Sequence, residues 1–145
     1  MIKEYTNSDF NLCCELYIKV FNSPPWNDKW TMGTIGVYLH ELIDNKRFFG
    51  FTLWDESILT GAIFCHGKSW YKGDEAYIDE LFVASELQRK GRGKTLMDCV
   101  EKFAKDNNYA SITLLTGREN PSYDFFVKYG YKQLNYMAFM HKQIE

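Results

Sequence analysis

The fold is decided by the stretch QRKGRG, residues 88–93, which lies between an apolar run ending at Val83 and an amphipathic segment beginning near Gly93. A strand, a glycine-containing turn and the start of a helix together form a binding site for phosphate. Glycine lets the main chain approach an anion closely, and the first N–H groups of the helix point at it. The stretch therefore predicts a phosphorylated cofactor.

Two other phosphate-binding motifs are excluded by single residues. A nucleotide-binding P-loop ending at GKT, residues 93–95, requires glycine at the position that Gln88 occupies. A dinucleotide-binding GxGxxG requires glycine at the position of Leu96. What remains is a strand followed by the pattern [Q/R]xxGx[G/A].

Length, charge and cysteine content narrow the class of protein. The chain has 145 residues and a net charge of −2 at pH 7, which predicts one domain over residues 1–145 and argues against nucleic-acid binding. No apolar run is long enough for a membrane span, and charged residues stand where a signal peptide has its apolar core, so we expect a cytoplasmic protein. The four cysteines lack metal-binding spacing, so we expect buried thiols and no metal site.

Hydrophobic periodicity predicts eleven main elements. We expect strands at residues 2–5, 48–54, 58–66, 76–83, 111–116, 131–134 and 137–141, and helices at about 8–22, 28–42, 93–105 and 121–129. The order β-α-α-β-β-β-α-β-α-β-β predicts an α/β (α+β) fold: a mixed, mostly antiparallel sheet of about seven strands flanked by about four helices. The strand at 76–83 carries Asp79 and Glu80 at its centre, where a buried strand normally has no acids.

Three segments in this order resemble consecutive signatures of the GNAT superfamily of N-acetyltransferases. They are YIDELFV at residues 77–83, the loop at residues 88–93, and NPSYDFFVKYGY at residues 120–131. The resemblance covers nearly the whole chain, with a weaker resemblance to the aminoglycoside 6′-N-acetyltransferases of that superfamily. It implies the GNAT fold and transfer of an acetyl group from acetyl-coenzyme A to a primary amine of a small molecule or peptide.

The resemblance also implies where the cofactor binds. In that family the fourth and fifth strands splay apart, and the pantetheine arm lies in the gap. The implied contacts are Leu81, Phe82 and Val83 for the pantetheine arm; Gln88, Arg89, Lys90, Gly91, Arg92, Gly93, Lys94 and Thr95 for the pyrophosphate; and Asn120 and Phe126 for the thiol end. A solvated basic turn is the alternative interpretation of the charged residues in the loop.

The chemistry of amine acetylation requires a base. An alkylammonium with a pKa near 10.4 is deprotonated in only about one molecule in a few thousand at pH 7. Glu80, on a strand beside the cofactor, is our candidate because burial would raise the pKa of its carboxyl. Strand alternation places Asp79 on the opposite face. The alternative for either acid is a loop cap or an ion pair with a lysine.

A proton donor to the leaving thiol is less important, because a thiol with a pKa of about 8.5 departs readily as a thiolate. The family often has a tyrosine at the position of Phe126, so we nominate Tyr123, one helical turn earlier, as the donor. Packing of Tyr123 against the sheet is the alternative.

The acceptor amine is the least defined part of the prediction. Trp26 and Trp30 are expected to form one wall of its site, with Trp70 and Tyr71 opposite, although Trp26 could instead fasten the second helix. The acidic stretch that contains Asp79 suits a cationic amine.

The expected partner is thus an amine-bearing small molecule or peptide, with neither nucleic acid nor a membrane. The sequence leaves open whether the chain forms a homodimer. A non-catalytic acyl-coenzyme A sensor is the alternative function.

Overall fold

The computed structural model describes all 145 residues, which divide into two compact units, residues 1–115 and residues 116–145. The first unit contains β1 (Ile2–Glu4), α1 (Phe10–Phe21), α2 (Met32–Ile43), β2 (Phe48–Asp55), β3 (Ile58–Lys68), β4 (Glu75–Val83), α3 (Arg92–Asp106) and β5 (Ser111–Leu114), with short 3-10 helices at Asn7–Asp9 and Ser85–Leu87. The second unit contains α4 (Pro121–Lys128). The predicted order of elements is therefore confirmed as far as α4.

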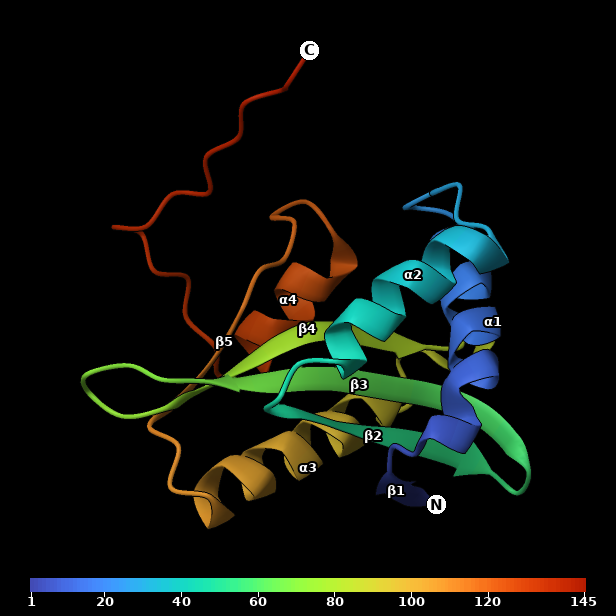
Figure 1. Cartoon of the computed structure of the whole chain (residues 1–145), viewed down its shortest axis with the longest axis horizontal. Helices are drawn as coiled ribbons and strands as arrows, with labels where there is room; N and C mark the ends of the chain where they lie inside the picture. The colour runs from blue at the N-terminus through green and yellow to red at the C-terminus, as the bar shows by residue number, and fades with distance from the viewer. The chain divides into compact units, whose positions relative to one another are not determined.

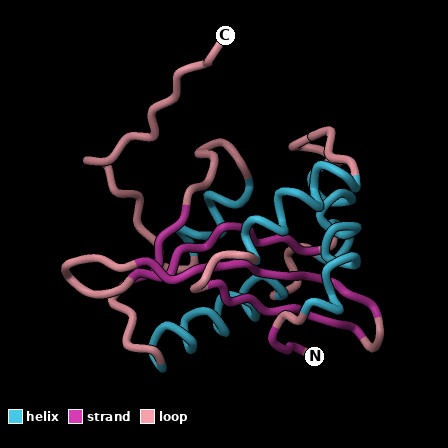
Figure 2. Tube along the Cα trace, in the orientation of Figure 1, coloured by secondary structure: helices cyan, strands magenta, loops and turns pink.

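The strands form one mixed sheet in the order β1-β2-β3-β4-β5. Neighbouring strands are antiparallel except for β4 and β5, which are parallel. Helices α1 and α2 cover one face of the sheet and α3 covers the other (Figure 1). The tube in Figure 2 shows the long β2, β3 and β4 side by side between these helices. Their hairpin connections explain why adjacent strands in the sequence are neighbours in the sheet.

The two faces of the sheet are built by alternation of side chains along β3. Ala62 and Phe64 belong to the apolar cluster under α1 and α2. The intervening Ile63 and Cys65 are also fully buried but lie outside that cluster. Continuous burial of β3 therefore reflects helices on both faces, which is why its sequence is apolar without a polar alternate.

Two predicted strands do not form, so the sheet has five strands rather than the seven expected. Residues 131–134 and 137–141 are irregular, and their loop hydrogen bonds are local to the second unit, such as Met137 N–H to the carbonyl of Leu134. The apolar residues of this segment, including Phe139 and Met140, are exposed. Apolar alternation predicts a strand only where a neighbouring strand completes the ladder, and none does so here.

The ladder between β4 and β5 is short. It joins Glu75–Ile78 to Ser111–Leu114 and goes no further. The second half of β4, from Asp79 to Val83, therefore has β3 on one side and no ladder partner on the β5 side. The ladder ends where β5 itself ends, at Leu114, so the separation of the fourth and fifth strands that the resemblance implied stays a prediction.

Candidate active site

Glu80 extends from β4 toward two helices. One of its carboxylate oxygens, Oε1, accepts a hydrogen bond of 2.6 Å from the hydroxyl of Tyr17 on α1, and Tyr38 on α2 also hydrogen-bonds the carboxylate. Burial raises the pKa of Glu80 to about 7, although the two hydrogen bonds act to lower it. A carboxyl group with this pKa can accept a proton at neutral pH and release it again, as a general base must.

Tyr17 is a permanent donor to this carboxylate. Its side chain is buried, and burial, followed by the negative charge of Glu80, raises the pKa of its hydroxyl well above the usual range. The same two effects raise the pKa of Tyr38. Both tyrosines therefore stay protonated at any pH at which the protein works, and their hydrogen bonds stabilise the ionised form of Glu80.

Asp79 is the extra residue of a β-bulge. The ladder with β3 pairs Phe64 with Glu80 and then Cys65 with Ile78, so Asp79 has no partner of its own. Its carboxylate lies 2.7 Å from Nδ1 of a histidine on β3, His66. That histidine follows Phe64 by two residues and so shares the face of Phe64 and Glu80. The prediction that Asp79 points to the opposite face is therefore wrong, because a bulge interrupts the alternation on which it relied.

The bulge gives the site two acids with different environments. Burial raises the pKa of Asp79, while the hydrogen bond and charge of His66 lower it. The negative charge of Asp79 in turn raises the pKa of Glu80. Like charges on neighbouring residues disfavour double ionisation, so the bulge helps to keep the pKa of Glu80 near neutrality.

The loop between β4 and α3 has the main-chain geometry of an anion-binding turn. Arg89 and Gly91 have positive φ angles of 65° and 83°, and Gly91 is the N-cap of α3. The first amides of a helix have no acceptor within it, so this end of α3 presents N–H groups and the positive end of its dipole to an anion. A Cβ placed on Gly91 would meet nothing within 4 Å. The loop therefore presents main-chain N–H groups to an anion, and its binding of a pyrophosphate stays a prediction.

Several side chains of this loop bind protein atoms. Gln88 donates from Nε2 to the carbonyl of Val83 at 3.1 Å, and Arg92 donates to the carboxylate of Asp55 at 2.7 Å. Thr95, nominated as a hydroxyl ligand, donates to the carbonyl of Gly91 at 3.0 Å. These contacts fix the shape of the loop, so binding of a phosphate here would rest mainly on the main chain.

The connection between α1 and α2 supplies aromatic rings. Trp30 stacks on Tyr38, with ring centroids 5.5 Å apart and an interplanar angle of 22°, and meets Tyr17 edge to face at 5.5 Å. Trp26 instead contacts Phe21 of α1. Helix α2 begins at Met32, capped by Thr31, rather than at about residue 28 as predicted. The intervening segment, residues 22–31, is thereby left as a loop that carries Trp30 next to the tyrosines.

The loop between β3 and β4, which contains Trp70 and Tyr71, lies at the other end of the sheet from the α1–α2 connection (Figure 1). Both side chains are exposed, and their rings contact each other. The structure therefore does not bring them opposite Trp30 as expected.

The predicted residues of α4 belong to the second unit. Asn120 is the N-cap of α4, Tyr123 donates its hydroxyl to Gln133 at 3.0 Å, and Phe126 is buried against Phe125 and Tyr131. Their roles at the thiol end of the cofactor stay predictions.

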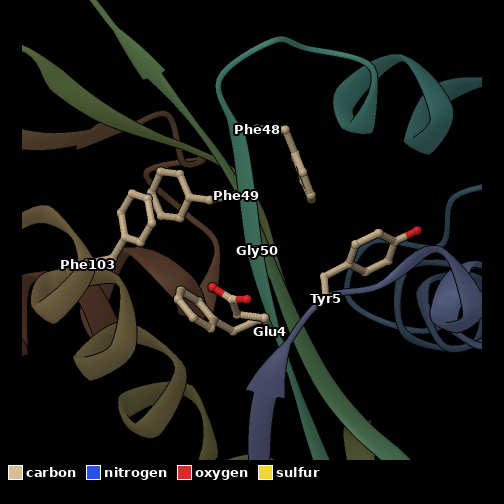
Figure 3. Close-up of a pocket in the computed structure, with 7 residues that line it drawn as sticks. Glu4, Tyr5, Phe48, Phe49, Gly50 and Phe103 are labelled. Atoms are coloured by element: carbon tan, nitrogen blue, oxygen red, sulfur yellow. The ribbon is translucent and has the colours of Figure 1, made fainter. Parts of the chain in front are cut away.

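One pocket of the structure is not lined by Glu80. It has a volume of about 270 Å³ and is wrapped around the start of β2. Figure 3 shows Phe49 and Phe103 on one side of that strand and Tyr5 with Phe48 on the other. None of the residues nominated from the sequence lines it.

Three residues of the site were missed by reasoning from the sequence: Tyr17, Tyr38 and His66. The two tyrosines had been assigned to apolar helix faces, and His66 to the end of a strand. One signal was present, since a hydroxyl on a helix face that covers an acid-bearing strand has an evident partner. Three of the four cysteines are buried as expected, namely Cys13, Cys14 and Cys65, whereas Cys99 is only partly buried. Burial raises the pKa of each thiol.

The structure contains no group of three or more histidine, cysteine or acidic side chains arranged to hold a metal ion. No helix combines the length and apolar character needed to cross a membrane.

Comparison with known families gives one extended match. The acetyltransferase (GNAT) family matches residues 13–131. This range includes β4, the loop before α3, and α4. No curated protein matches the sequence.

Solved structures share the fold at low sequence identity. A probable acetyltransferase superposes with a TM-score of 0.81 at 13% identity, covering 100% of this chain and 98% of that one. A GNAT family acetyltransferase from Staphylococcus aureus has a TM-score of 0.74 at 23% identity, covering 99% and 98%. An aminoglycoside 6′-N-acetyltransferase from Acinetobacter haemolyticus has a TM-score of 0.78 at 15% identity, covering 100% and 99%.

Proposed function

This chain belongs to the acetyltransferase (GNAT) family and is an acetyl-coenzyme A-dependent acyltransferase, and on that premise we propose that it acetylates a primary amine by direct attack, with Glu80 as general base. The observation that carries the proposal is the Glu80 carboxyl itself, which is half-buried on the bulged strand, accepts a hydrogen bond from Tyr17 and has a pKa of about 7. An acid of ordinary pKa would be a far weaker base toward an ammonium.

The proton balance follows from the acceptor. A primary amine reaches the site mainly as its ammonium, and one proton must leave before the nitrogen has a lone pair to attack with. Glu80, in its ionised form, takes that proton directly or through a water molecule. Tyr17 and Tyr38 hold the carboxylate in place throughout, since each donates to it and neither loses its own proton.

The cofactor supplies an activated thioester whose leaving group is a moderately stable thiolate. Two parts of the chain have the geometry to bind this cofactor. The unpaired edge of β4 after Ile78 can hydrogen-bond an extended pantetheine arm, and the start of α3 can hold the pyrophosphate. A strong proton donor to the thiol is not required, so Phe126 in the family's tyrosine position is compatible with turnover.

The test is release of coenzyme A thiol from acetyl-coenzyme A across a panel of amines, with wild type beside Glu80→Gln. The proposal expects amine-dependent thiol release that the substitution lowers by about 10²- to 10⁴-fold in kcat. Retention of full turnover by Glu80→Gln would remove Glu80 as the base. Saturable cofactor binding without thiol release on any amine would instead favour the sensor.

A further inference from the structure

A one-residue shift in the pairing of β3 with β4 decides which face of the sheet Glu80 occupies. The ladder pairs Phe64 with Glu80 but Cys65 with Ile78, so one residue of β4 is skipped between them. If the register of Cys65 with Ile78 continued along the strands, Glu80 would pair with Ile63, and its side chain would point to the other face of the sheet. The hydrogen bond between Glu80 and α1 therefore depends on the shift.

The skipped residue is Asp79, and His66 on β3 holds its side chain. Nδ1 of His66 lies 2.7 Å from Oδ2 of Asp79. An ionised carboxylate can only accept a hydrogen bond, so Nδ1 carries the hydrogen and donates it. The ring of His66 packs on Tyr77, its partner in the ladder, with ring centroids 5.3 Å apart. A side chain of β3 thereby fastens the bulge of β4.

The inward position of Asp79 is costly without this donor. The side chain of Asp79 is only 12% exposed, and burial raises the pKa of its carboxyl while the hydrogen bond and charge of His66 lower it. The charge of Asp79 also raises the pKa of Glu80, since neighbouring carboxylates repel each other. An ionised Asp79 without a donor would be more stable in water than beside Glu80. Loss of His66 should therefore release Asp79 from its place in the bulge.

From these contacts we propose that His66 is a positioning residue: its hydrogen bond to Asp79 fixes the bulge and thereby holds the Glu80 carboxylate against the hydroxyl of Tyr17. The inference rests on the proposed function of Glu80 as the base. His66 acts through Asp79 and needs no contact with the amine or with acetyl-coenzyme A. Its role requires a hydrogen-bond donor at the position of Nδ1 and no basic nitrogen, which distinguishes it from a second general base.

Two substitutions of His66 separate these roles. Asparagine can place an amide N–H where Nδ1 stands, since both nitrogens are bonded to Cγ, but it has no basic nitrogen. Phenylalanine keeps a ring and has no donor. With an amine that the wild type acetylates, we expect kcat to fall about tenfold to a hundredfold in His66→Phe, because the base is misplaced, and to stay within about threefold in His66→Asn. Equal losses in both variants would overturn the positioning role, and so would full turnover of His66→Phe.

Proton NMR gives a readout that needs no turnover. The hydroxyl of Tyr17 donates to Glu80 at 2.6 Å, a short, charge-assisted hydrogen bond. Its proton should exchange slowly with water and give a separate signal, assigned by its absence in Tyr17→Phe. We expect this signal in the wild type and in His66→Asn, and its loss in His66→Phe; persistence in His66→Phe would contradict the proposal. If no amine supports thiol release, the proposed function fails, while this signal still tests whether His66 positions Glu80.

Two further variants complete the test. Asp79→Leu breaks the same contact from β4, so it should also lose the Tyr17 signal, and a retained signal would overturn the proposal even if His66→Phe does not fold. His40→Phe is the matched control, because His40 is exposed on α2, and it should change kcat by less than about twofold. The KM for acetyl-coenzyme A should stay within about twofold in every variant, because none of the substitutions lies in the loop before α3.

Discussion

The acid cluster, formed by Asp79 and Glu80 on β4, and the loop before α3 follow each other along the chain, yet they act through different atoms. The loop offers main-chain N–H groups at the start of a helix, and its side chains mostly hold its own shape. The cluster offers the carboxylate of Glu80, whose properties depend on tyrosines from two distant helices. The loop is therefore a local structure, whereas the cluster exists only after the tertiary fold has formed.

This difference predicts which substitutions damage chemistry and which damage cofactor binding. Glu80→Gln removes the base and keeps a similar shape, so kcat should fall by about 10²- to 10⁴-fold. The KM for acetyl-coenzyme A should stay within about twofold, because the loop is untouched. Steady-state kinetics with both substrates varied measures each constant. A large rise in that KM would break the separation between the two regions.

The same substitution should stabilise the protein in alkaline solution. The pKa of Glu80 rises from 4.5 to about 7 on folding, so its contribution to stability is fully present below pH 4.5 and is lost as the pH rises through 7. Glu80→Gln removes that loss. We expect the free energy of unfolding to increase by about 2–3 kcal/mol at pH 8 and to change little at pH 4.5. Urea titrations at the two pH values provide the check, and equal effects at both would contradict the assigned pKa.

In the loop before α3, Gly91→Ala should weaken the binding of acetyl-coenzyme A and leave the acetyl-transfer step unchanged. Gly91 has a φ of +83° with open space around it, so an alanine there would suffer from backbone strain alone. We expect the KM for acetyl-coenzyme A to rise about fivefold to tenfold with kcat preserved. Gly36→Ala in α2 is the matched control, because its Cβ also meets nothing within 4 Å and the helix favours alanine.

The smallest effect is expected at the ion pair between Arg92 and Asp55. It joins the start of α3 to the end of β2 at 2.7 Å, and Asp55 is half exposed. Exposed ion pairs contribute about 0.2–1 kcal/mol, so Asp55→Asn should raise the dissociation constant for coenzyme A by about twofold to fivefold at most. Calorimetric titration measures it. A loss of binding altogether would mean that the loop depends on side chains from outside it.

The sequence predicted what is encoded locally. The loop and its helix start were predicted from neighbouring residues. Glu80 was nominated as the base because the family resemblance places its strand beside the cofactor, and a raised pKa was expected from its burial there. Tyr17 and Tyr38 were not identified, because their contact with Glu80 depends on how α1 and α2 cross the sheet. The face of Asp79 was mispredicted because a bulge has no reliable signature in one sequence.

Errors in the elements have a similar cause. The strands expected at residues 131–134 and 137–141 were inferred from apolar alternation, which indicates a strand only when a pairing partner exists. The start of α2 was predicted near residue 28, whereas the structure begins the helix after Thr31, which forms a reciprocal capping pair with Thr34.

We expect Glu80 to titrate near neutrality because its partial burial on the bulged strand raises the pKa by more than the hydrogen bonds from two tyrosine hydroxyls lower it. The most direct measurement is a carbon-13 NMR titration of the Glu80 carboxyl in the whole chain, assigned by comparison with Glu80→Gln. The account predicts a pKa of about 7, moving upward in Tyr17→Phe, which removes a hydrogen bond to the ionised form. A pKa below about 5 in the wild-type protein would contradict it.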